Sequence, residues 1–123
     1  MALIAGSCTV PEPEITLAQS GFVPGYVGGV ASDEPRASAV AFEILNMGGT
    51  AADAAVALAF TLTVTHPVAA GLGGGGACLV YSGPQNTIES LDFLPRVAGL
   101  GGTVAVPGMA LGLDQLHRRY GVL

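Results

Sequence analysis

The sequence predicts a mixed α+β fold in which helices pack against a few strands. Two segments, residues 35–47 and 109–120, carry apolar side chains at three- and four-residue steps, as the buried face of a helix does. A third segment, residues 51–64, is rich in alanine and apolar on nearly every face. Residues 77–81 and 87–93 have the composition of short strands, with turn-forming residues between them. Together these segments indicate three helices and a pair of strands.

The composition is that of a folded chain. Half of the 123 residues are hydrophobic, enough to bury a core, and only 11% are charged. The formal net charge is -5, and the four basic residues, all arginines, form no stripe that would follow a phosphate backbone. The apolar runs are too short to cross a bilayer. We therefore expect no nucleic acid partner and no membrane span.

The beginning of the chain differs from the rest. Residues 1–27 contain three prolines and no sustained period, which predicts an extended or partly disordered leader before a domain over residues 28–123. Residues 1–8 are apolar but lack a basic start and are too short for the core of a signal peptide, so no export signal is expected and the compartment stays open. Cys8 and Cys78 are not expected to form a disulfide.

The first helix is predicted from its end signals. Residues 28–32 read as a short strand, after which Asp33 and Glu34 supply capping carboxylates and Pro35 fits the first helical turn. Gly48–Gly49 supplies the left-handed stop. The apolar positions between these signals recur at helical spacing and are Ala37, Val40, Ala41, Ile44 and Leu45.

The second helix has a capping box at its start. Thr50 is the expected N-cap, and Asp53 three residues later completes the box and favours the positive end of the helix dipole. Residues 51–64 are apolar on nearly every face, which predicts a helix buried on all sides. At 1.5 Å per residue it would be about 21 Å long, too short for a bilayer. His66 is expected at its end, hydrogen-bonded to a carbonyl, because Pro67 follows.

A hairpin and a third helix complete the prediction. The glycine run 71–76 leads into residues 77–81, whose continuous apolar run predicts a fully buried strand, and 87–93 returns as its partner after the turn 82–86. Pro107–Gly108 opens the last helix, in which Gly112 predicts a close backbone contact. Its apolar stripe is Met109, Leu113, Leu116 and Tyr120, and its polar side, expected to be solvated, is Asp114, Gln115, His117, Arg118 and Arg119.

No cofactor or metal is expected. Residues 71–76 satisfy the pattern G-x-G-x-x-G, but they follow a helix and precede a strand, the reverse of the order that a phosphate-binding loop needs. Packing of their backbone against a partner strand is the expected role. The two histidines, His66 and His117, have single carboxylates near them in the sequence rather than a cluster, so no metal ligand set is assembled.

Four motifs occur in order along the chain: G-G-V-A-S-D-E-P-R-A-S from Gly28, E-I-L-N-M-G-G-T-A-A-D-A-A-V-A from Glu43, T-H-P-V-A-A-G-L-G-G-G-G from Thr65, and V-P-G-M-A-L-G-L from Val106. This series resembles the start of the large subunit of the gamma-glutamyltranspeptidases. The resemblance implies that residues 28–123 are an N-terminal portion of that subunit. It also implies part of an αββα N-terminal-nucleophile hydrolase fold, in which helices pack on a central sheet.

The resemblance implies an enzyme, made as an autoprocessing zymogen, that hydrolyses or transfers the gamma-glutamyl group of glutathione and related amides. Its nucleophile would be the first threonine of a small catalytic subunit, beyond Leu123, so no catalytic residue is expected here and the chain alone should be inactive. Thr65 precedes a histidine as that threonine does, but it closes a helix and is not expected to become a free N-terminus.

The expected partners are therefore the small catalytic subunit and a gamma-glutamyl small molecule, and family members are often periplasmic or extracellular. Two alternatives stay open. One is a divergent amidase or acylase with another acyl group, similar to a cephalosporin acylase. The other is a non-catalytic, truncated paralogue.

Arg96 is the candidate substrate-binding residue. In the family an arginine directly after Asp-Phe, in a D-F-R-E-T-A-P motif, binds the α-carboxylate of the gamma-glutamyl group, a task that suits a planar bidentate donor. Here Leu94 follows Asp92-Phe93, and Arg96 comes two residues later after a proline. Two residues along an extended segment point to the same side, which favours the same pocket. A surface or structural ion pair is the alternative role for Arg96.

Overall fold

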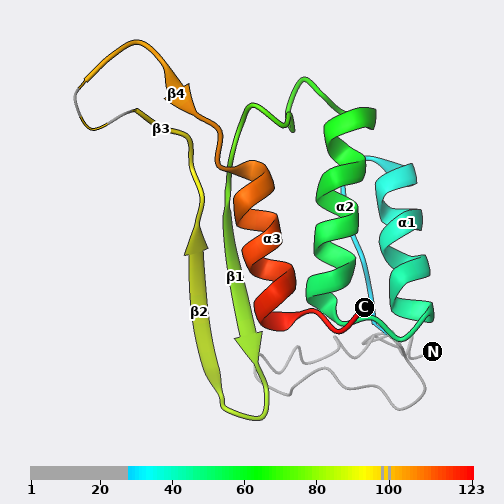
Figure 1. The fold of residues 1–123 in the computed structure, drawn as a ribbon. Coiled ribbons are helices and arrows are strands. Elements are labelled where there is room, and N and C mark those ends of the chain that lie inside the picture. The colour runs from blue at the N-terminus through cyan, green and yellow to red at the C-terminus, as the bar shows by residue number, and fades with distance from the viewer. Residues whose placement is uncertain (1–27, 98, 100) are drawn as a thin grey trace, which may run out of the picture.

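The computed structural model describes residues 28–97, 99 and 101–123, so the predicted leader and Cys8 lie outside the described residues. The described part is an α+β unit (Figure 1). Its elements are α1 (Pro35–Asn46), α2 (Ala51–Thr65), β1 (Ala77–Ser82), β2 (Thr87–Asp92), β3 (Arg96–Val97), β4 (Ala105–Val106) and α3 (Met109–Tyr120). Helices α1 and α2 lie side by side, and α3 packs between α2 and the β1–β2 hairpin.

The ends of α1 are as predicted, with Glu34 as the cap. The Glu34 carboxylate accepts a hydrogen bond from the Ala37 backbone N–H at 2.8 Å, Pro35 opens the helix, and Gly48 follows its end with a φ of +91°. The strand predicted over residues 28–32 is wrong. This segment is irregular because, in the part of the chain that is described, no neighbouring strand exchanges backbone hydrogen bonds with it.

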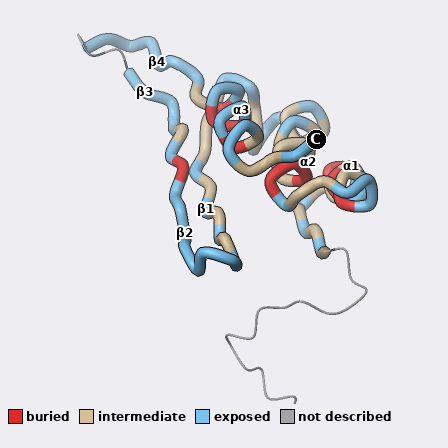
Figure 2. Tube along the Cα trace, turned by 60° about the horizontal axis from the view of Figure 1, so that its bottom comes forward, coloured by how far each residue is buried: buried red, intermediate tan, exposed pale blue. Residues whose placement is uncertain are grey.

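The predicted capping box of α2 is confirmed. Thr50 Oγ1 accepts from the Asp53 N–H at 3.2 Å, and Asp53 Oδ2 accepts from the Thr50 N–H at 2.8 Å. The prediction of all-round burial is wrong, because α1 and α3 cover only part of the helix and Phe60 and Val64 face outward. Figure 2 shows the buried stretch of α2 confined to its first turn. His66 caps the end through its backbone N–H, as its position before Pro67 predicts.

The predicted hairpin forms, with an antiparallel register that runs from Ala77 opposite Asp92 to Ser82 opposite Thr87. The prediction of a fully buried first strand is wrong. Side chains alternate across a strand, and the helices cover only one face of this hairpin, so Cys78 is half-buried while Leu79 is 75% exposed. The continuous apolar sequence therefore does not report burial on both faces.

A second, shorter hairpin pairs Arg96 with Val106 and Val97 with Ala105, and it projects from the body of the molecule (Figures 1 and 2). Strands of two residues carry no readable period, which is why the sequence did not predict them.

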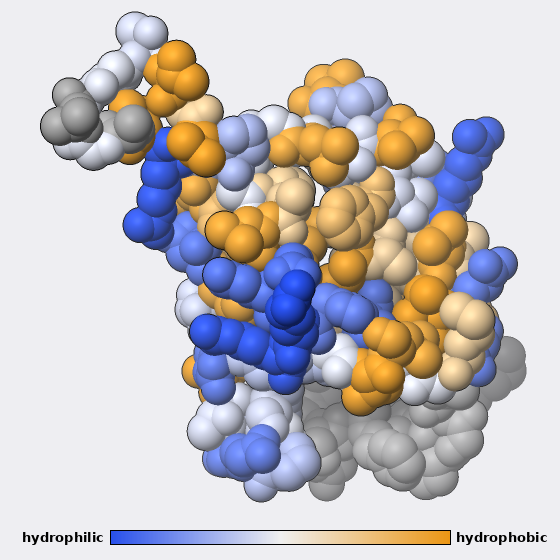
Figure 3. Space-filling view, viewed as in Figure 1, coloured by the Kyte–Doolittle hydropathy of each residue, from blue (hydrophilic) through white to orange (hydrophobic). Residues whose placement is uncertain are grey.

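Most of the core of the described part lies in two small clusters of buried side chains. One lies between α1 and α2 and contains Ala41, Leu45 and Ala54. The other joins α2, β2 and α3 through Ala52, Leu91 and Leu116. The predicted stripe of α3 faces inward, with Leu116 in this second cluster and Tyr120 packed against it. The polar side of α3 forms the hydrophilic patch in the middle of Figure 3. None of the described helices is long and apolar enough to cross a membrane.

Candidate substrate-binding site

Phe93, the residue after β2, is enclosed by glycines. Its N–H donates to the Gly76 carbonyl at 2.9 Å. A Cβ added at Gly75 or Gly108 would collide with the Phe93 carbonyl oxygen, and one added at Gly112 would collide with the Phe93 side chain. The neighbours of Phe93 at these positions must therefore be glycines, because any side chain there would overlap it. The close contact predicted at Gly112 is confirmed, with a side chain as the partner.

The glycine run also holds the start of α3. The Gly74 carbonyl accepts from the N–H groups of Gly108 at 3.0 Å and Met109 at 3.1 Å. The glycines thus bind backbone to backbone, between the end of the β1–β2 hairpin and α3. This agrees with the packing role expected for residues 71–76.

Arg96 follows this fixed point. Asp92 Oδ1 accepts from the Leu94 N–H at 3.1 Å, and Asp92 Oδ2 lies 3.3 Å from Arg96 Nη2. The side chains of Arg96 and Asp92 are 75% and 51% exposed. Arg96 is therefore an accessible guanidinium held by one local carboxylate, and its backbone is paired with Val106 in the short hairpin.

A cavity of about 220 Å³ lies beside Arg96. Asp92, Phe93 and Leu94 form one side of it, the β4–α3 connection a second, and α3 the third. The polar side chains that line it are Asp92, Arg96 and Gln115, and the rest of the lining is apolar or glycine. An exposed bidentate donor above a partly apolar cavity suits a small organic carboxylate.

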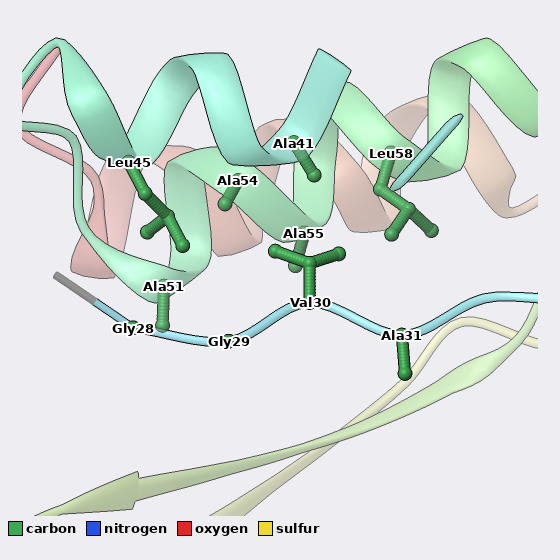
Figure 4. Close-up of a pocket in the computed structure, with 10 residues that line it drawn as sticks. All are labelled: Gly28, Gly29, Val30, Ala31, Ala41, Leu45, Ala51, Ala54, Ala55 and Leu58. Atoms are coloured by element: carbon green, nitrogen blue, oxygen red, sulfur yellow. The ribbon is translucent and has the colours of Figure 1, made fainter. Parts of the chain in front are cut away.

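A larger cavity, of about 390 Å³, lies between residues 28–31 and the pair α1–α2. Figure 4 shows Val30 pointing toward the helices and Leu45 and Leu58 facing it. Its lining consists of glycine, alanine, valine and leucine, so no side chain there offers a proton, a charge or a hydrogen bond. Size alone does not make it a site of chemistry.

Asp53 forms a polar junction that the sequence only partly revealed. It is 4% exposed, and its carboxylate accepts from the Thr50 hydroxyl at 2.9 Å and the Val122 N–H at 3.0 Å. Burial raises the pKa of Asp53, but the hydrogen bonds from Val122 and Thr50 outweigh it and hold the pKa below its ordinary value. The carboxylate is therefore ionised and structural.

His117 belongs to the same junction. Its Nε2 lies 3.2 Å from Asp53 Oδ1 and its side chain is 43% exposed, so the expected solvated histidine is in contact with water on one side and with a buried carboxylate on the other. Its polar position on α3 is close enough to the first turn of α2 to reach the buried carboxylate. A contact between residues so far apart in sequence leaves no local signal.

The remaining candidates show no chemistry of their own. The Thr65 hydroxyl donates to the Thr61 carbonyl at 3.0 Å inside α2. His66 is exposed at the helix end. Across residues 28–97, 99 and 101–123, no three histidine, cysteine or acidic side chains come together as metal ligands.

The sequence model of the family described as Gamma-glutamyltranspeptidase matches residues 37–99, just over half of the chain. The chain belongs to this family. The match includes most of α1, all of α2, the glycine run, the β1–β2 hairpin and Arg96.

Curated relatives agree. The chain is 36% identical over 112 residues to glutathione hydrolase 7 of Bos taurus. This alignment covers 80% of this chain and 17% of the relative. It is 42% identical over 101 residues to the glutathione hydrolase proenzyme of Escherichia coli (strain K12). This alignment covers 75% of this chain and 17% of the relative. The chain thus spans about a sixth of the length of these two relatives.

The fold agrees as well. A solved gamma-glutamyltranspeptidase from Pseudomonas nitroreducens, in complex with L-DON, superposes with a TM-score of 0.72 at 34% identity. The superposition covers 78% of this chain and 34% of that one. The described α+β unit is therefore similar to one part of a gamma-glutamyltranspeptidase.

Proposed function

We propose that this chain is the N-terminal part of the large subunit of an enzyme that hydrolyses or transfers the gamma-glutamyl group of glutathione and related amides. Residues 28–123 would be that portion, preceded by the leader 1–27. The family match over residues 37–99 carries the proposal, and relatives named glutathione hydrolase support it. Within the complete αββα fold, α1, α2 and α3 would form part of a helical layer and β1–β2 part of a sheet.

The nucleophile of this enzyme is a threonine outside the chain, at the start of a small catalytic subunit. Relatives named proenzyme support cleavage of a precursor into two subunits. An N-terminal threonine attacks the gamma-amide carbonyl with its own α-amine as base, and an acyl-enzyme forms. Water then releases glutamate, or an acceptor amine takes the gamma-glutamyl group.

Arg96 is the contribution of this chain to substrate binding. Arg96 lines the 220 Å³ cavity and its side chain is 75% exposed, so a substrate α-carboxylate can reach it. A carboxylate held by a charge-assisted, bidentate contact is fixed in orientation as well as in place. The gamma-amide at the other end of the glutamyl group is thereby positioned for attack.

The test is the specificity of Arg96 variants in the complete protein that carries this chain. Arg96→Ala should lower kcat/KM for gamma-glutamyl-p-nitroanilide by about 30-fold or more, the effect of losing a charged hydrogen-bond partner worth about 2 kcal/mol. Arg96→Lys should recover part of the loss, because it keeps the charge without the fork.

Two controls make this test specific. The substrate 4-aminobutyryl-p-nitroanilide lacks the α-carboxylate, so Arg96→Ala should leave its kcat/KM nearly unchanged. Arg118→Ala removes an arginine that is equally exposed and also paired with a carboxylate, but on α3 away from the cavity, and should have no effect. An equal loss for both substrates in Arg96→Ala would contradict the proposed role.

Leu94 supports a second candidate, an acylase for another acyl group. It stands where the family motif has arginine, and Arg96 lies two residues later. An enzyme of that kind would cleave glutaryl-p-nitroanilide, which lacks the α-amino group, in preference to the gamma-glutamyl compound. The ratio of the two kcat/KM values decides between these functions.

A further inference from the structure

Asp92 lies between a fixed backbone and the guanidinium of Arg96. One of its oxygens, Oδ1, accepts from the Leu94 N–H at 3.1 Å. The other, Oδ2, lies 3.3 Å from Arg96 Nη2. The first contact fixes the carboxylate relative to the main chain, and the second fixes one end of the guanidinium relative to the carboxylate.

The main chain at this point has little freedom. Phe93, between Asp92 and Leu94, is hydrogen-bonded to Gly76 and enclosed by Gly75, Gly108 and Gly112. Asp92 itself ends β2 opposite Ala77. A carboxylate anchored on such a backbone has a well-defined position. The arginine side chain that it holds is more flexible, with four rotatable bonds of its own.

The ion pair does not have the character of a stabilising contact. Both partners are half or more exposed, and exposed pairs of this kind contribute little to stability. Asp92 engages a single terminal nitrogen of a guanidinium that carries five N–H donors. Among the described residues the other nitrogens of Arg96 have no acidic partner, so they can take a second carboxylate.

We propose that Asp92 is a positioning residue, which aims the guanidinium of Arg96 at the carboxylate of a substrate in the neighbouring cavity. This inference rests on the proposed function, in which Arg96 binds that carboxylate. Asp92 touches neither the reacting amide nor the nucleophile, and it acts only through Arg96. Substrate binding then orders less of the arginine side chain, because Asp92 has already restricted it.

The experiment is a comparison of Asp92→Asn, Arg96→Ala and the double variant in the complete protein. Asparagine keeps an oxygen for the Leu94 N–H and removes the charge that holds Arg96. Asp92→Asn should raise KM for gamma-glutamyl-p-nitroanilide about three- to fivefold, with kcat little changed. For 4-aminobutyryl-p-nitroanilide, which has no carboxylate to aim at, KM should stay as in the wild type.

The double variant tests whether Asp92 acts through Arg96. In the Arg96→Ala background, Asp92→Asn should have no further effect on either substrate. Asp114→Asn is the matched control, because Asp114 forms the same kind of exposed pair with Arg118 at 2.8 Å but lies away from the cavity. The control should leave KM unchanged for both substrates.

The outcomes separate the two levels of inference. If Arg96→Ala penalises both substrates equally, the proposed role of Arg96 fails. If Arg96→Ala is selective but Asp92→Asn leaves KM unchanged, Arg96 binds the carboxylate and the inference about Asp92 is wrong. A decrease in KM in Asp92→Asn would overturn it as well, since Asp92 would then compete with the substrate for Arg96.

Discussion

Asp53 holds the first turn of α2 against the last turn of α3. Its carboxylate accepts from Thr50 on one side and from the Val122 N–H on the other, where His117 Nε2 also lies 3.2 Å from Asp53 Oδ1. Gly121 makes this approach possible, because a Cβ there would collide with Asp53 Oδ1. A buried charge of this kind is tolerated because several hydrogen bonds satisfy its oxygens.

We predict that Asp53→Asn lowers the free energy of unfolding by about 1.5–3 kcal/mol, since charge-assisted hydrogen bonds are lost and an amide N–H group faces donors. Urea denaturation followed by circular dichroism measures the change. Asp114→Asn, at an exposed pair, should shift it by less than about 0.5 kcal/mol. Equal effects in the two variants would show that burial of Asp53 contributes nothing.

The same residue predicts a pH dependence. The folded-state pKa of Asp53 lies below its ordinary value, so its contribution is complete above the unfolded pKa and is lost as pH falls through the folded pKa. From about pH 5 down to below the folded pKa, which itself lies under the ordinary aspartate value, the wild type should therefore lose its stability advantage over Asp53→Asn. The urea midpoints of both proteins across this range give the difference. A constant difference would contradict the lowered pKa.

At the scale of elements, the glycines that pack around Phe93 join the β1–β2 hairpin to α3. Gly75, Gly108 and Gly112 each approach Phe93 more closely than any side chain would allow. This explains why a glycine is present inside α3, where it costs helical stability. The packing fixes the segment from which both Asp92 and Arg96 project.

We predict that Gly112→Ala lowers the free energy of unfolding by about 1–3 kcal/mol, because the added methyl group overlaps the Phe93 side chain and one of them must move. Gly83→Ala is the control, since nothing lies within 4 Å of a Cβ there, and it should change stability by no more than about 0.5 kcal/mol. Thermal or urea denaturation of the two variants compares them. If both are neutral, the contact between Gly112 and Phe93 is not tight.

The helices and the long hairpin were predictable because their signals are local. Each signal lies within a few residues of the helix end or helix face that it specifies. Examples are the caps at Glu34 and Thr50, the stop at Gly48 and the apolar stripe of α3. The contact between His117 and Asp53 was not predictable, because it depends on how α2 and α3 pack. The burial of α2 and β1 was overestimated. An apolar sequence shows that a face is suited to burial, but whether the face is buried depends on which neighbouring elements pack against it.

At the scale of the whole molecule, the proposed function places the nucleophile outside this chain. We predict that the purified 123-residue chain releases no p-nitroaniline from gamma-glutamyl-p-nitroanilide above a heat-treated control. The physical reason is that Thr65 lies at the end of α2 with its hydroxyl bonded inside the helix, not at a free N-terminus. Activity of the pure chain that disappears on heating would contradict this.

The Asp53 junction also has a consequence for the order of folding. The hydrogen bond from Val122 to Asp53 spans 69 residues of sequence, whereas α1, α2 and the β1–β2 hairpin close through much shorter loops. Closing the long loop costs more chain entropy, so this contact is expected to form after the folding transition state. Asp53→Asn should then accelerate unfolding in stopped-flow experiments and leave the refolding rate nearly unchanged. A matching slowdown of refolding would place the junction in the folding nucleus instead.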